Sequence, residues 1–200
     1  MHHRPFQQVD VFTATAYRGN PLAVVLDGTG LSTEEMQQFT RWTNLSEADV
    51  ALIARGLGVV REDIVQHAWC DNGPVWLGLL LDSADTVLGL TPDHARLKDL
   101  GQDVGVIHIA PDAGDNPARP GAVVRAFAAP MGNPEDPVTG SLNASLAQWL
   151  IGEGLAPTRY LVAQGECLGR AGRVYIHQDG QGQVWVGGHT VTCIEGTALL

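Results

Sequence analysis

Basic residues are scarce in this chain of 200 residues, where 12 Lys and Arg stand against 22 Asp and Glu. A chain this acidic lacks the basic surface that follows a nucleic-acid backbone, so we expect no nucleic-acid partner. Cysteine is scarce too. Cys70, Cys167 and Cys193 are too few and too scattered for a disulfide framework or a zinc cage. The cysteine usage therefore favours a reducing, cytoplasmic setting.

Long hydrophobic runs are also missing. No apolar stretch approaches the roughly 20 residues that cross a bilayer, and residues 1–10 lack the apolar centre of a secretion signal. We therefore expect no membrane segment. Hydrophobic residues still make up 44% of the chain, against 17% charged residues, which is enough for a buried core and excludes a disordered chain.

Short apolar or alternating segments separated by glycine-rich turns predict many strands and few helices. The predicted strands cover 9–12, 22–26, 62–69, 75–81, 104–110, 123–127, 159–163, 174–177, 184–186 and 190–195. The predicted helices cover 32–44, 49–58, 92–100 and 139–151, while 84–90 fits either a strand or a helix. Ser32 and Glu35 form a capping-box pattern at the first helix.

The helix over 139–151 lacks a clearly polar face, and this feature decides the fold class. Such a helix is buried on all sides when an antiparallel sheet wraps around it. A doubly wound parallel sheet would need helices alternating with nearly every strand, and the pattern lacks them. The sequence therefore predicts an α+β fold, a curled and mostly antiparallel sheet around one central helix.

The densest group of functional candidates, residues 132–141, lies directly ahead of this helix. The backbone amides of Gly140 and Ser141 would be unpaired at the positive end of the helix dipole, a suitable position for a carboxylate. Asp136 lies at the edge of this position, next to Glu135. The alternative is a simple helix cap, in which Asp136 or Thr139 only satisfies the helix amides, and spacing alone favours that interpretation.

A second candidate is Glu47, which follows the predicted first helix. An acid near the negative end of a helix is unfavourable, and a semi-enclosed pocket would favour its protonated form and suit it to moving a proton. The alternative is a solvated surface acid. The histidines show no metal-ligand spacing, His189 fits a packed or a solvated side chain, and Cys193 alternates with Val191 as a core residue would. No phosphate-binding glycine motif is present, so we expect neither metal nor cofactor.

Four blocks of the sequence resemble the PhzF-like (phenazine biosynthesis) isomerases: residues 9–13, 19–25, 44–47 and 135–141, followed by similar closing strands at 169–174 and 184–188. The resemblance implies a diaminopimelate-epimerase-like fold, with two similar halves that each curl a sheet round a central helix. It also implies cofactor-free proton transfer on a small carboxylated substrate, and a homodimer. The family's proton-shuttling glutamate falls on Glu47, its aspartate on Asp136, and its substrate-anchoring glycine and serine on Gly140 and Ser141.

One family block is missing. Members carry Gly-His-Pro-Thr at the central helix of the first half, and this sequence contains none. We therefore expect residues 1–50 to form an incomplete N-terminal half, a hairpin plus a helix, and residues 51–200 to form the complete C-terminal half. Two hypotheses follow: an isomerase using Glu47 and Asp136, or a non-catalytic relative that binds small carboxylates or self-associates through Phe39 and Trp42.

Overall fold

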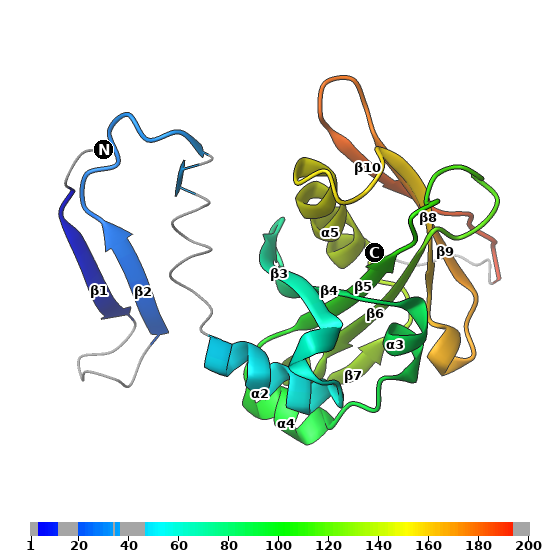
Figure 1. Cartoon of the computed structure of the whole chain (residues 1–200), viewed down its shortest axis with the longest axis horizontal. Helices are drawn as coiled ribbons and strands as arrows, with labels where there is room; N and C mark the ends of the chain where they lie inside the picture. Colours follow the sequence, from blue (N-terminus) through cyan, green and yellow to red (C-terminus); the bar gives the residue numbers. More distant parts are fainter. Residues whose placement is uncertain (1–3, 12–19, 34, 37–46, 194–200) are drawn as a thin grey trace, which may run out of the picture. The chain divides into compact units, whose positions relative to one another are not determined.

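The computed structural model describes residues 4–11, 20–33, 35–36 and 47–193 (Figure 1). Within these ranges the side chains of residues 6, 8–11, 20–24, 47 and 48 are not described. The chain divides into two compact units, Met1–Asp49 and Val50–Leu200. In the described ranges, no helix combines the length and the apolar character needed to span a bilayer.

The first unit contains a β-hairpin and the start of a helix. Strands β1 (Phe6–Val11) and β2 (Asn20–Val25) pair antiparallel. The predicted capping box is confirmed, because the Ser32 amide donates to Glu35 Oε2 (2.9 Å) and the Glu35 amide donates to Ser32 Oγ (3.2 Å). The remainder of that predicted helix, with Phe39 and Trp42, lies outside the described residues.

The second unit consists of one eight-stranded sheet and the helices that pack on it. Its helices are α2 (Glu47–Leu57, which begins just before the unit), α3 (Ala84–Gly89), α4 (His94–Asp99) and α5 (Gly140–Gly152), with 3-10 turns at Arg61–Asp63, Ala129–Met131 and Glu166–Leu168. Its strands are β3 (Ile64–Asp71), β4 (Val75–Leu81), β5 (Val104–Ile109), β6 (Ala122–Ala128), β7 (Asn133–Asp136), β8 (Arg159–Gln164), β9 (Gly172–Gln178) and β10 (Val184–Gly187).

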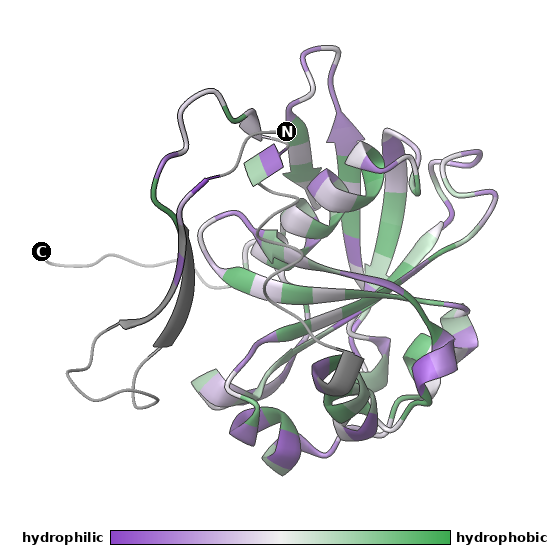
Figure 2. Cartoon of the chain, turned by 60° about the vertical axis from the view of Figure 1, so that its left-hand side comes forward, coloured by the Kyte–Doolittle hydropathy of each residue, from purple (hydrophilic) through white to green (hydrophobic). Residues whose placement is uncertain are grey.

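The sheet follows the order β10-β9-β8-β6-β5-β4-β3, and β7 pairs with β6 beside this path. Only the β4–β5 and β6–β8 pairs are parallel among the pairs of this sheet; the others are antiparallel. The predicted α+β class with a mostly antiparallel sheet is therefore confirmed. Figure 2 shows the hydrophobic colour in bands along many strands of this sheet, and the hydrophilic colour on loops, on the short helices and on parts of the strands.

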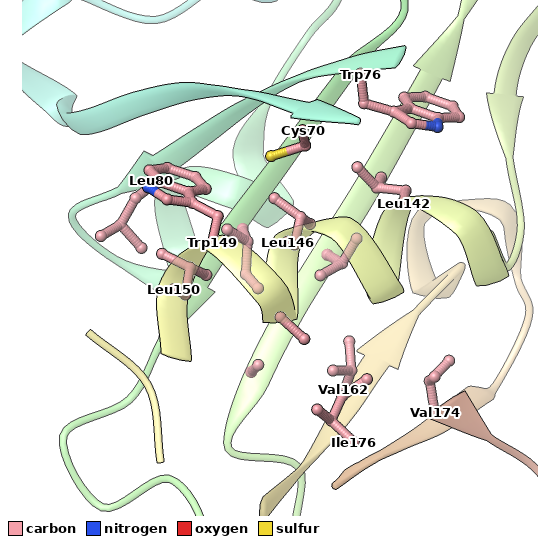
Figure 3. Close-up of a cluster of buried hydrophobic side chains, with 14 of the residues drawn as sticks. Cys70, Trp76, Leu80, Leu142, Leu146, Trp149, Leu150, Val162, Val174 and Ile176 are labelled. Carbon is pink, nitrogen blue, oxygen red and sulfur yellow. The ribbon is translucent and has the colours of Figure 1, made fainter. Parts of the chain in front are cut away.

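Helix α5 lies inside the curl of the sheet. It contacts β3 and β4 near one end of the strand order and β9 and β10 at the other end. Figure 3 shows Leu142, Leu146 and Leu150 of α5 between side chains from both ends of the sheet, and all three leucines are fully buried. Strands therefore cover the helix on two sides, whereas a stripe along it stays half-buried (Ser141, Ala144 and Ile151) or exposed (Gln148), so the predicted burial on all sides is only partly right.

A row of small residues lies beneath α5. Ala68, Gly78, Gly105 and Ala126 are register partners across β3, β4, β5 and β6. A Cβ atom on Gly105 would overlap the side chain of Leu142, and one on Gly78 would lie 2.9 Å from Leu146 Cδ2. Because real Cβ atoms do not approach neighbours this closely, the row sets how near α5 can lie to the sheet.

One open prediction is decided and two are corrected. Of the stretch 84–90, which fits either a strand or a helix by sequence, residues Ala84–Gly89 form helix α3, whose N-cap Ser83 accepts a hydrogen bond from the Thr86 amide (3.0 Å). Residues 190–193 do not form the predicted strand 190–195: they pair with no strand of the described sheet, and residues 194 and 195 lie outside the described residues. Val191 is 83% exposed and Cys193 is exposed, so the prediction that Cys193 belongs to the core is wrong.

Candidate functional site at the N-terminus of α5

Strand β7 delivers Asp136 to the start of α5. Asp136 is the last residue of the strand and is the register partner of Ala126 in β6, at the end of the row of small residues. Three residues later, Thr139 is the N-cap of α5 in an extended conformation (φ −115°, ψ 101°). The turn 137–139 therefore places a carboxylate beside the first turn of a buried helix.

Thr139 holds Asp136 and does not cap the helix with its side chain. Its hydroxyl Oγ1 donates to Asp136 Oδ2 at 2.6 Å, and it makes no capping hydrogen bond to an amide of α5. Thr139 is only 7% exposed, so water has little access to this bond. The helix-cap alternative, in which Thr139 or Asp136 satisfies the helix amides, does not describe this arrangement.

Gln164, the last residue of β8, holds the same turn from below. It is 1% exposed and accepts at Oε1 from the Thr139 amide (3.2 Å) and from Asn143 Nδ2 (2.8 Å). Its Nε2 donates to the carbonyl oxygen of Asp136 (3.1 Å) and to Thr139 Oγ1 (3.1 Å). Sequence reasoning missed this residue. The available signal was a lone glutamine at the buried end of an apolar strand, where it must find hydrogen-bond partners.

The amides of Gly140 and Ser141 are open donors. Neither makes a hydrogen bond within the part of the chain that the structure describes; the first amide of α5 to find an intrahelical partner is that of Asn143, which donates to the Thr139 carbonyl (3.1 Å). Gly140 is exposed and Ser141 is half-buried. Two free N–H groups at the positive end of a 13-residue helix favour an anion of the size of a carboxylate.

Glu135, which the sequence places at the edge of this site, is engaged elsewhere. Arg125 Nε donates to Glu135 Oε1 (2.9 Å) and Nη2 donates to Oε2 (2.8 Å), and each side chain is only 7% exposed. Arg125 also donates through Nη1 to the carbonyl of Leu90 (2.9 Å). This bidentate pair joins β6, β7 and the end of α3, so we assign Glu135 a structural role.

Glu47 cannot be placed in the same way. The residue begins α2, where the sequence predicted the end of the preceding helix and a loop, and its side chain lies outside the described residues. Its backbone belongs to the first unit, whereas Asp136, Gly140 and Ser141 belong to the second. The role of Glu47 therefore stays a prediction.

Asn72 Nδ2 also reaches the site by donating to the Ser141 carbonyl (3.0 Å), whereas the following features lie apart from it. His189 is exposed and its Nε2 bonds Tyr175 Oη (3.2 Å). In the described ranges no group of three or more metal-binding side chains occurs together. A cavity of about 290 Å³ lies between the loop at Gly114 and strands β8 and β9, and none of its lining residues belongs to the α5 site.

Comparison with known proteins places these features in context. A family model described as a phenazine biosynthesis-like protein (PhzC-PhzF) matches residues 9–54 and 47–196. The chain is 36% identical over 126 residues to an uncharacterized isomerase of Deinococcus radiodurans, covering 58% of this chain and 40% of that protein. It is 53% identical over 47 residues to antisense-enhancing sequence 1 of Schizosaccharomyces pombe, covering 24% of this chain and 16% of that protein. The chain thus spans less than half the length of these curated relatives.

Two solved structures resemble the whole chain. A PhzF family protein of Bacillus anthracis matches with a TM-score of 0.55 and 16% identity, covering 90% of this chain and 93% of the other. A predicted epimerase of Pseudomonas aeruginosa matches with a TM-score of 0.54 and 18% identity, covering 94% and 96%. At these identities the likeness establishes the fold, and it confirms the predicted diaminopimelate-epimerase-like architecture.

Proposed function

The chain belongs to the PhzC-PhzF family of phenazine biosynthesis-like proteins, and from this premise we propose that it is an isomerase that moves a proton on a small carboxylated substrate without a cofactor. In this proposal the amides of Gly140 and Ser141 bind the substrate carboxylate and Asp136 exchanges a proton with the substrate. Glu47 is the second acid/base group. The isomerase name of the Deinococcus radiodurans relative supports the reaction class.

The chemistry needs only these groups. A carboxylate side chain removes a proton from a carbon near the bound carboxylate, and the electron pair left behind shifts into the adjacent unsaturated system. The proton then returns to another carbon or to the other face, so no electron acceptor is required. Donors fixed beside the developing negative charge lower the barrier because they need no reorganisation during the step.

One observation carries the proposal: two unpaired amides of α5 lie one turn from Asp136, whose Oδ1 makes no hydrogen bond within the described residues. The site thus combines an anion-binding position and a carboxylate oxygen available for proton exchange. Neither a pure helix cap nor a structural ion pair would leave both groups open, as the engaged neighbour Glu135 illustrates.

The proposal is tested by hydrogen–deuterium exchange at carbon. The protein is incubated in D₂O with a panel of small carboxylates that carry a double bond or a stereocentre near the carboxyl group, and loss of each C–H signal is followed by NMR. Asp136→Asn should lower the exchange rate by about 10²-fold or more, the usual contribution of a general acid/base. Asp115→Asn is the matched control, because Asp115 is an exposed loop acid.

Full exchange in the Asp136→Asn variant would refute the role of Asp136, and full turnover in Glu47→Gln would refute that of Glu47. A second candidate, a carboxylate-binding protein without catalysis, is favoured by the lack of the family's Gly-His-Pro-Thr block. The two are separated by titrating acetate while observing the Gly140 and Ser141 amides. Saturable shifts without carbon exchange on any substrate of the panel would favour the binder.

A further inference from the structure

Among the residues that the structure describes, only one of the two carboxylate oxygens of Asp136 accepts a hydrogen bond. We propose that Thr139 and Gln164 are positioning residues that reserve the other oxygen, Oδ1, for proton transfer. The inference rests on the proposed role of Asp136 and adds two residues: Thr139, which the sequence offered only as a helix cap, and Gln164, to which neither the sequence nor the comparisons assign a role.

Two backbone groups fix the orientation of the Gln164 side-chain amide. The backbone N–H of Thr139 can only donate, so the atom it contacts at 3.2 Å is the Gln164 oxygen. The backbone carbonyl of Asp136 can only accept, so the atom it contacts at 3.1 Å is the Gln164 nitrogen. Two groups of known polarity thus agree on one orientation, and Asn143 Nδ2 supports it by donating to the same oxygen (2.8 Å).

The Thr139 hydroxyl links Gln164 to Asp136 through two hydrogen bonds. Gln164 Nε2 donates to Thr139 Oγ1 at 3.1 Å, so this hydroxyl already accepts a hydrogen bond. The hydroxyl donates its single proton to Asp136 Oδ2, at 2.6 Å. Asp136 Oδ2 is then an acceptor and carries no proton of its own.

The second carboxylate oxygen of Asp136, Oδ1, is left for proton transfer. Oδ1 of Asp136 has no hydrogen-bond partner among the described residues, and the side chain is only half-buried. Any proton that Asp136 gains or releases is consequently carried by Oδ1. Because Thr139 and Gln164 are 7% and 1% exposed, water cannot readily replace the chain that holds Oδ2. The carboxylate is thereby held in one rotamer before substrate arrives, which is how fixed groups reduce the cost of reaction.

The test is a direct measurement of the Asp136 side-chain rotamer. Three-bond N–Cγ and C′–Cγ couplings of Asp136 are measured by NMR in the wild type and in three variants. Thr139→Val removes the hydroxyl at nearly constant side-chain shape, and Thr139→Ser retains it. Ser145→Ala is the control: it removes a hydroxyl within α5 that bonds the Ser141 and Leu142 carbonyls and not Asp136. We expect one dominant rotamer in the wild type, in Thr139→Ser and in Ser145→Ala. Thr139→Val should change the rotamer ratio by about 10-fold, as expected for a hydrogen bond to a charged group.

A single unchanged rotamer in Thr139→Val would overturn the inference. Gln164→Met provides an independent variant, because it removes the Nε2 group that donates to the Thr139 hydroxyl. This variant should also broaden the rotamer distribution of Asp136. An unchanged distribution would contradict the claim that Gln164 orients the Thr139 hydroxyl. The couplings require no substrate, so this test is decided even if the wild type exchanges no proton at carbon, the result that would defeat the proposed function alone. On a substrate found with the panel, Thr139→Val should lower kcat about 10-fold with KM nearly unchanged, and Thr139→Ser should restore it.

Discussion

Replacing Gly105 by alanine tests how closely α5 packs on the sheet. Gly105 lies in β5 within the row of small residues, and its backbone does not adopt a positive φ, so alanine is compatible with the local conformation. The new Cβ would lie 2.7 Å from Leu142 Cδ2 and closer still to Cδ1. Leu142 is fully buried, so its side chain can yield only by displacing other core residues.

The expected magnitude combines two opposing contributions. An added methyl group in a well-packed core costs about 1–3 kcal/mol through displaced side chains and backbone. The lower conformational entropy of alanine in the unfolded chain returns about 0.4–1 kcal/mol. We therefore expect Gly105→Ala to lower the free energy of unfolding by roughly 1–2 kcal/mol.

Urea unfolding of the full chain measures this difference, as a lower midpoint at an unchanged m value. Gly89→Ala is the matched control, because its added Cβ meets no atom within 4 Å and its φ is also not positive; it should leave stability unchanged or raise it by a few tenths of a kcal/mol. Equal midpoints for Gly105→Ala and Gly89→Ala would refute the close packing of Leu142 on β5.

Two further predictions concern buried charge. Arg125→Met should destabilise the protein by about 3–5 kcal/mol because it leaves Glu135 buried without a partner. The control Arg119→Met breaks an exposed pair with Asp112 and should cost under about 1 kcal/mol. Similar losses of unfolding free energy for the two variants in chemical denaturation would contradict the stabilising role of the buried Arg125–Glu135 pair. Burial raises the pKa of Asp103 above its usual 3.8, so the wild type loses stability as the pH rises through this raised pKa. Asp103→Asn removes that loss of stability. Thermal unfolding should therefore show the variant to be more stable than the wild type at neutral pH, and this gain in stability should shrink toward about pH 3. A gain that does not depend on pH would argue against this cause.

Local periodicity was sufficient to predict much of the fold. Strand Val75–Leu81 has the predicted bounds, and helix α5 is shifted by one residue from the predicted 139–151. Strand β7 was not predicted because Asn133–Asp136 contains a proline and two acids, and its extended form depends on pairing with β6 and on the bond between Glu135 and Arg125. These partners lie up to 10 residues earlier in the chain and leave no periodic signal within Asn133–Asp136 itself.

The candidate site divides in the same way. Asp136, Gly140 and Ser141 were predictable because they belong to one short segment before an apolar helix. Gln164 was not, since it bonds Thr139 from 25 residues away, at the end of a strand whose preceding buried residues are apolar or aromatic. Sequence reasoning can identify groups presented by a local motif, but not the buried side chain that orients them.

The position of α5 between both ends of the sheet has a consequence for biosynthesis. The helix ends at Gly152, whereas two strands that cover it, β9 and β10, begin only at Gly172 and Val184. A nascent chain that has emerged as far as α5 can pack one side of this helix on β3 and β4, but it leaves the other apolar side bare until the last strands leave the ribosome. Aggregation during translation is therefore expected to depend on how quickly β9 and β10 are synthesised after α5. A ribosome stalled just after α5 should expose the uncovered apolar side of this helix and favour aggregation.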